Sequence, residues 1–154
     1  MSTAVEANVE SLPNEPEANK LFRMVMKYKG SDLHLKVGVA PSMRLAGVLR
    51  QMQLPQLTPH DMERLMYPLL TPRQRGILDE EGGVDFAHII TDGDTETRFR
   101  VNLFRQRGRL SLVARRVNNK IPTFHDLHLP PVLAEITQND QGIIILAGGT
   151  GSGK

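Results

Sequence analysis

Several short stretches of the chain alternate apolar and polar residues, which predicts strands that bury one face and expose the other. In 32–37, leucine or valine occupies every second position, with His34 and Lys36 between them. Turns that contain glycine, aspartate or proline separate the stretches, so we expect neighbouring strands to pair antiparallel. The expected strands are 32–37, 43–46, 48–54, 84–91, 95–104 and 110–115.

Other segments carry apolar residues at helical spacing. The first helix should begin near Glu15 or Pro16, where proline suits the first turn, and should end at Gly30. Thr58 and Thr71 are each followed by proline, and this pairing of an N-cap hydroxyl with a first-turn proline marks two further helix starts. Helices that flank an antiparallel sheet predict an α+β fold. The expected helices are 15–29, 59–70, 72–78 and 131–137.

A different pattern begins after Gly142. An apolar run at 143–146 suits a strand buried on both faces of a parallel sheet, and a glycine-rich loop follows it. One glycine, four residues and a final Gly-Lys make the spacing of a P-loop. Glycine lets backbone N–H groups surround a phosphate, and the lysine reaches the β- and γ-phosphates of ATP. The residues expected to bind the ATP phosphates are Gly148, Gly149, Thr150, Gly151, Ser152, Gly153 and Lys154.

The alternative interpretation of this loop is a flexible Gly/Ser tail. The strand before it and the position of the lysine favour the P-loop. The hydroxyl that holds Mg²⁺ normally follows the lysine, so the Mg²⁺ ligand is expected beyond Lys154, where the sequence stops. We therefore expect a truncated ATPase core, an inactive chain in ATP hydrolysis, and poor packing of 142–154.

The length and composition of the chain limit the classes of protein to which it can belong. The chain has 154 residues, which suits one domain or one domain and the edge of a second. A net charge of +2 implies no strong attraction to nucleic acid, and the absence of cysteine excludes disulfides. No apolar run approaches a membrane span and no signal-peptide pattern is present. We expect a cytoplasmic protein with no nucleic-acid partner and no direct membrane insertion.

Two features of the sequence could bind a metal ion, but each has a more common explanation. His34 lies on the polar face of a predicted strand, where a lone histidine is usually solvated. The acidic run 79–81 ends a predicted helix, and such ends are usually solvated too. We predict no metal site in this chain.

Arginines are concentrated between Arg98 and Arg116. Arg98 and Arg100 are two residues apart on one face of a predicted strand, and Arg115 lies on the next strand. Such a patch can bind nucleic acid, be a solvated face, or bind phosphate oxygens through bidentate contacts. The P-loop favours the third interpretation, because ATP hydrolysis needs charge neutralisation at the γ-phosphate.

Four motifs in order resemble one family: 31–35, Ser-Asp-Leu-His-Leu; 85–86, Asp-Phe; 98–102, Arg-Phe-Arg-Val-Asn; and the 148–154 loop. The series resembles the twitching-motility retraction ATPases (PilT-like) within the type II and type IV secretion ATPase superfamily. The loop departs from the family by carrying Gly149 where proline is usual. Residues 1–14 are polar, acidic and unpatterned, which predicts a disordered leader, and this leader is longer than is usual in the family. The resemblance implies a PAS-like antiparallel sheet domain at 15–117, a linker at 118–130, and the start of a RecA-like ATPase domain at 131–154.

The resemblance also implies a homo-hexamer that binds ATP and Mg²⁺ between its two domains. Arginines of the N-terminal domain then approach the phosphates across a subunit boundary. By position in the motifs, Arg100 and Arg115 are the candidate arginine fingers, and Arg98 is a weaker third. The linker near Asn118 would be the hinge, and an inner-membrane platform protein of a pilus or secretion system would be the partner.

The resulting hypothesis is the N-terminal portion of a hexameric motor that powers type IV pilus retraction. One alternative is a motor for pilus assembly or type II secretion, since the fold and chemistry would be the same. An alternative of another class is a non-catalytic PAS-like interaction module, in which the arginine face binds an acidic partner.

Overall fold

The computed structural model describes residues 15–118, 121–150 and 152. The predicted leader at 1–14 lies outside these residues, as do Gly151, Gly153 and Lys154 of the glycine-rich loop. The chain divides into two compact units, Met1–Asn119 and Lys120–Lys154. No helix among the described residues is long and apolar enough to cross a membrane.

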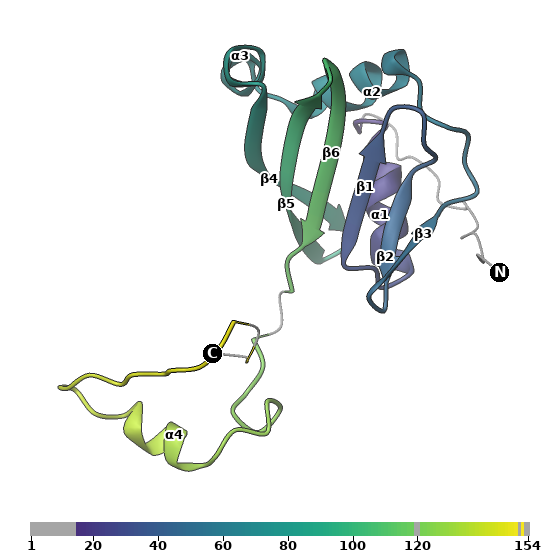
Figure 1. The fold of residues 1–154 in the computed structure, drawn as a ribbon. Coiled ribbons are helices and arrows are strands. Elements are labelled where there is room, and N and C mark those ends of the chain that lie inside the picture. The colour runs from purple at the N-terminus through teal and green to yellow at the C-terminus, as the bar shows by residue number, and fades with distance from the viewer. Residues whose placement is uncertain (1–14, 119–120, 151, 153–154) are drawn as a thin grey trace. The chain divides into compact units, whose positions relative to one another are not determined.

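A six-stranded antiparallel sheet forms the first unit (Figure 1). Its strand order is β3-β2-β1-β6-β5-β4, so two meanders of three strands meet where β1 pairs with β6. All six predicted strands are confirmed, and their order explains how residues far apart in sequence come together. The strands are β1 (Asp32–Lys36), β2 (Ser42–Leu45), β3 (Val48–Gln51), β4 (Gly83–Asp92), β5 (Thr95–Gln106) and β6 (Arg109–Arg116).

Helices start where their capping residues permit. Helix α2 (Pro59–Met66) and helix α3 (Pro72–Glu81) each begin with a complete capping box, formed by Thr58 and by Thr71 as predicted. The α-helix of α2 is shorter than predicted and continues as the 3₁₀ helix η1 (Tyr67–Leu69). Pro68 lacks a backbone N–H, so the α-helical hydrogen bond that this position would donate cannot form.

The first helix begins later than predicted. Helix α1 (Asn19–Lys27) starts four residues after Glu15, and the backbone N–H of Asn19 donates to the carbonyl of Pro16 at 2.9 Å in a turn before the helix. The Glu15 carboxylate does not sit in the first helical turn. It instead accepts hydrogen bonds from Arg23 Nη2 at 2.8 Å and from Asn19 Nδ2 at 3.3 Å.

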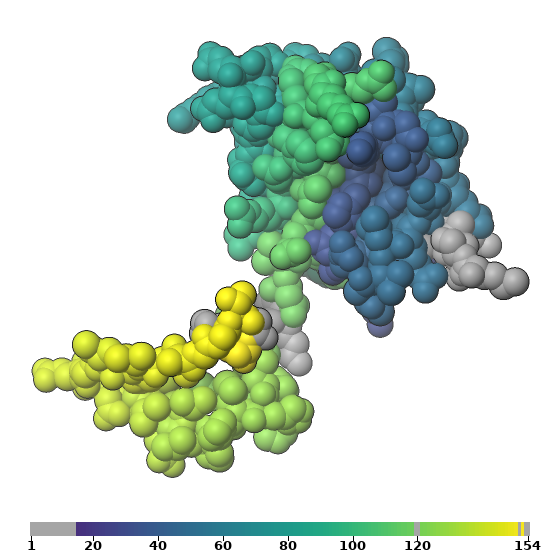
Figure 2. Space-filling model, in the orientation of Figure 1, coloured from purple at the N-terminus to yellow at the C-terminus, as the bar shows by residue number. Residues whose placement is uncertain are grey.

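One face of the sheet carries the core, and α1 crosses behind it in Figure 1. Phe22 of α1 packs on Phe99 of β5, with ring centroids 5.0 Å apart. Helix α1 also contacts β1 and β4, while α2 contacts β6. The inward side chains Leu33, Val101 and the rest of the cluster are buried, and the alternate positions face outward. Figure 2 shows side chains of the two meanders side by side on that outer face.

The second unit holds one short helix, α4 (Val132–Ile136), close to the predicted 131–137. The predicted strand at 143–146 is wrong, because the structure gives these residues no regular secondary structure and exposes all four side chains. A parallel strand forms only against a hydrogen-bonding neighbour, and the described residues of this unit contain no other strand. The exposure of 143–146 agrees with the expected poor packing of this segment.

Replacement of Phe99 by alanine tests the core. Because this side chain is fully buried against Phe22, Phe99→Ala should lower the free energy of unfolding by about 3–5 kcal/mol. Ile89→Ala on the outer face of the adjacent strand is the matched control and should change it by less than about 1 kcal/mol. Urea unfolding followed by circular dichroism measures both, and equal losses would contradict this assignment of the two faces.

Candidate functional site

A row of charged residues crosses the outer face of the sheet. The strand register places Arg100 of β5 opposite Arg115 of β6, Arg115 opposite Asp32 of β1, and Asp32 opposite Arg44 of β2. We call these four residues the arginine row. Side chains directly opposite on neighbouring strands lie close enough to interact. The two arginines that the sequence analysis proposed are therefore cross-strand neighbours.

Asp32 is the buried member of the arginine row, with a side chain only 5% exposed. It accepts hydrogen bonds from Arg115 Nε at 2.9 Å and from Ser31 Oγ at 2.7 Å, and its second oxygen lies 3.4 Å from Arg44 Nε. Burial alone would raise the pKa of Asp32, but the hydrogen bonds from Ser31 and Arg115 outweigh the burial and hold this pKa below its usual value. The carboxylate therefore remains charged and holds two arginines in place.

Arg115 uses one edge of its guanidinium to contact Asp32 and presents the rest to solvent. The contact is made by Nε, and the side chain is 76% exposed. Arg100 is similar but more loosely held, because its Nε lies 3.8 Å from Asp85 Oδ1 and its side chain is 78% exposed. In both arginines the carboxylate contact is made by Nε and most of the side chain is exposed, so each guanidinium has further N–H groups that can donate to an anion.

The hollow at this point measures ≈ 350 Å³. A pair of guanidiniums on adjacent strands supplies several donors to one set of phosphate oxygens. Arg98 does not line this hollow and instead borders a neighbouring one beside Arg100. The residues that line the hollow are Asp32, Asp85, Arg100, Asn102, Val113 and Arg115.

The sequence suggested Arg100 and Arg115 as candidates but gave no role to Asp32 or Asp85. Asp32 lies inside the motif 31–35 and Asp85 inside the motif 85–86, so the sequence did contain an indication that these aspartates matter. What the pattern lacked was the β1–β6 pairing, which brings Asp32 to Arg115 across 83 residues of sequence.

His34 lies on the same outer face and is partly buried. Burial, together with the charge of Arg44, lowers the pKa of its imidazole, so the ring favours its neutral form. Within the described part of the chain, no group of three histidine, cysteine, aspartate or glutamate side chains could hold a metal ion.

The glycine-rich loop belongs to the second unit. Among its described residues, Ser152 donates from Oγ to the carbonyl of Gly149 at 2.8 Å. A side chain added at Gly149 would meet open space, so the chain is uncrowded there. The structure thus brings together Arg100 and Arg115 in the first unit, while the loop belongs to the second unit.

No family model matches the chain, but individual proteins do. Over 138 residues, or 90% of its length, it is 34% identical to the type IV pilus ATPase PilU of Pseudomonas aeruginosa and 30% identical to that organism's type IV pilus retraction ATPase PilT. A crystal structure of the pilus retraction motor PilT with bound ADP matches 88% of the chain at 34% identity, with a TM-score of 0.75. The chain is homologous to the N-terminal region of PilT- and PilU-type ATPases.

This N-terminal region spans 35% of the length of PilU and 39% of that of PilT. Its α+β sheet domain with flanking helices matches the corresponding part of PilT. The Legionella pneumophila ATPase DotB has the same fold at 19% identity and a TM-score of 0.73. The family resemblance inferred from the sequence motifs is therefore confirmed.

An Asp32→Asn variant of the PilT-like region tests whether this carboxylate holds the arginine row by its charge. At pH 7 the free energy of unfolding should fall by about 1–3 kcal/mol, because Arg115 and Arg44 lose a buried charged partner. The folded pKa of Asp32 is depressed, so its stabilisation is present above the usual value of 3.8 and is lost as pH falls through the lower folded pKa. The difference in free energy of unfolding between the wild type and Asp32→Asn should therefore shrink as pH falls through this range.

The matched control is Asp85→Asn, since Asp85 is mostly exposed and its ion pair with Arg100 is long. It should change the free energy of unfolding by less than about 0.5 kcal/mol. Urea unfolding at a series of pH values measures both variants. If the free energy of unfolding of Asp32→Asn stays below that of the wild type by a constant amount down to the acid transition, the loss comes from changed packing and not from the lost charge.

Proposed function

We propose that this region is the N-terminal portion of a hexameric, ATP-hydrolysing motor, and that Arg100 and Arg115 contact the phosphates of ATP held by a neighbouring subunit. The observation that carries the proposal is their cross-strand pairing, with both guanidiniums exposed and Asp32 bonded to the Nε of Arg115. Homology to PilU and PilT, and the ADP in a PilT crystal structure, support the nucleotide as ligand.

The chemistry of the arginine row suits this role. Developing negative charge on phosphate oxygens is stabilised by donors that are already in position, which lowers the barrier without a reorganisation cost. Asp32 fixes the direction of Arg115 through Nε and leaves both Nη groups for the phosphate. The Lys154 ammonium and the loop N–H groups would hold the β- and γ-phosphates from the other side.

We further propose that 15–117 is a PAS-like domain, that 118–130 is a linker with its hinge near Asn118, and that 131–154 begins a RecA-like ATPase domain. The division of the chain into compact units after Asn119 supports this proposal. In this arrangement, ATP hydrolysis would change the orientation of the two domains, and the hinge would transmit that change to an inner-membrane platform protein.

In the complete protein, Arg100→Ala and Arg115→Ala should each lower kcat for ATP hydrolysis by about 10²-fold or more, while nucleotide affinity changes much less. Arg73→Ala, which removes an exposed arginine from α3, is the control and should leave turnover unchanged. Steady-state ATPase assays with a nucleotide-binding titration measure both quantities. Unchanged turnover in both row variants would favour the interaction module.

Action across a subunit boundary has its own test. Arg100→Ala subunits lack the arginine but keep the loop, whereas Lys154→Ala subunits keep the arginine and lack the loop lysine. If Arg100 acts in trans, mixing the two inactive proteins should restore part of the turnover. If mixtures stay as inactive as their parents, while wild-type subunits are shown to exchange, the arginine acts within its own subunit.

We propose that the direction of force is pilus retraction, and the similarity to PilT, which is named a retraction ATPase, supports this proposal. Removal of the complete protein from its host should then leave surface pili that extend but no longer shorten. Live imaging of labelled pili measures this result. Loss of all pili would indicate an assembly motor, and normal pili with failed protein export would indicate a secretion motor.

A further inference from the structure

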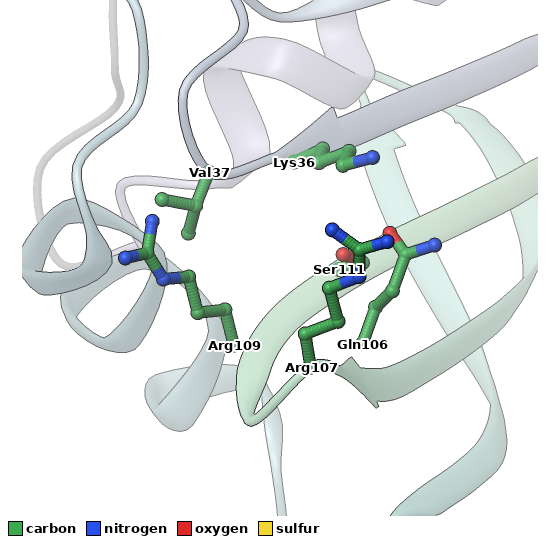
Figure 3. A pocket seen from close by; sticks show the side chains of 6 residues that line it. All are labelled: Lys36, Val37, Gln106, Arg107, Arg109 and Ser111. Atoms are coloured by element: carbon green, nitrogen blue, oxygen red, sulfur yellow. The ribbon is translucent and has the colours of Figure 1, made fainter.

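A second basic site lies at the hairpin that joins β5 to β6. It is a cavity of ≈ 550 Å³, and Figure 3 shows the cationic side chains around it, with Arg107 pointing toward Lys36. Arg109 is six residues before Arg115 on β6, which places it roughly 20 Å from the arginine row along the strand. We call this cavity the hairpin pocket. Its lining residues are Lys36, Val37, Gln106, Arg107, Arg109 and Ser111.

The charge of the hairpin pocket is unbalanced. Three cations line it and no acidic residue does. In the arginine row, by contrast, Asp32 pairs with Arg115, and Asp85 beside the row pairs with Arg100. Among the described residues, the cations of the hairpin pocket form no ion pair. The chain as a whole has a net charge of only +2, so this concentration does not follow from a generally basic composition.

The backbone of the hairpin gives an independent observation. Its two turn residues, Arg107 and Gly108, have φ angles of +52° and +75°. A turn with both central residues at positive φ strongly favours asparagine or aspartate before glycine, and a long side chain is uncommon there. Arg107 therefore occupies a position where its backbone preference opposes the fold, and its side chain reaches the hairpin pocket (Figure 3).

We propose that the hairpin pocket binds an anion that carries two or more phosphates. Two guanidinium forks and the Lys36 ammonium can share several phosphate oxygens, while the Gln106 amide and the buried Ser111 hydroxyl add neutral donors. The volume exceeds what one phosphate fills and falls within the usual range for small-molecule sites. A soluble oligophosphate and a multiply phosphorylated lipid headgroup share this chemistry. The proposal does not depend on the proposed ATPase function.

Calorimetric titration of the full chain with sodium tripolyphosphate tests the site. The double variant Arg107→Gln/Arg109→Gln should weaken binding by about 10-fold or more, since both guanidiniums contact the anion. Arg100→Gln/Arg115→Gln removes the same charge from the arginine row and should leave this binding event in place. Binding that is lost only in the second double variant, or in neither, overturns the proposal.

A single substitution separates binding from folding. Arg107→Asn places the favoured residue in the turn, so the melting temperature should rise or stay equal while tripolyphosphate affinity falls. An increase in melting temperature without any loss of affinity would show that Arg107 has no part in the site. Circular dichroism melts and the same titration supply both readouts.

The source of the phosphates is distinguished with vesicles. Phosphatidylcholine vesicles that contain cardiolipin, whose headgroup carries two phosphates, are sedimented with the chain and with the Arg107→Gln/Arg109→Gln variant. Co-sedimentation that the variant loses supports a lipid headgroup, and tripolyphosphate binding without co-sedimentation supports a soluble ligand. Binding of a polyglutamate peptide in place of both phosphate ligands would overturn the proposal in favour of an acidic protein partner.

Discussion

The pairing of β1 with β6 is the contact on which the rest of the first unit depends. Each meander has short connections, but neither can cover α1 alone. Joining them at β1 and β6 makes one sheet whose inner face is wide enough to bury Phe22 and its neighbours. The same pairing places Asp32 beside Arg115 on the outer face. One set of backbone hydrogen bonds thus creates both the core and the arginine row.

The two basic sites of this region differ in whether a carboxylate balances their positive charge. In the arginine row, a buried carboxylate orients Arg115 and fixes the position from which it can donate. In the hairpin pocket, the described residues supply no such carboxylate, and the cations gather at the end of a tight turn. A partly neutralised site suits a transient contact to phosphates, because it stays stable when the anion leaves. An unbalanced site gains more from a bound anion.

The two faces of the sheet divide structural and chemical roles. The inner face is filled by aliphatic and aromatic side chains under α1 and α2, and it explains why the domain folds. On the outer face of the described first unit, Arg100 and Arg115 are largely exposed. Most side chains of this face are exposed or partly exposed, so substitutions there should change stability little, whereas Asp32, Ser42 and Ser111 are buried exceptions.

The sequence by itself determined the local elements and the family. Alternation identified the six strands, threonine-proline pairs located α2 and α3, and the motifs pointed to Arg100, Arg115 and the PilT-like family. These features depend on residues a few positions apart, whose backbone and side-chain preferences can be read directly.

Only the tertiary structure decided which strands pair at long range. Alternation states which side of β1 is apolar but not that β6 is its neighbour, so the role of Asp32 could not be inferred. The strand expected at 143–146 failed for the same reason, because a strand exists only with a partner. Periodicity depends on each residue's own neighbours in the chain, whereas pairing depends on the free energy of the whole sheet.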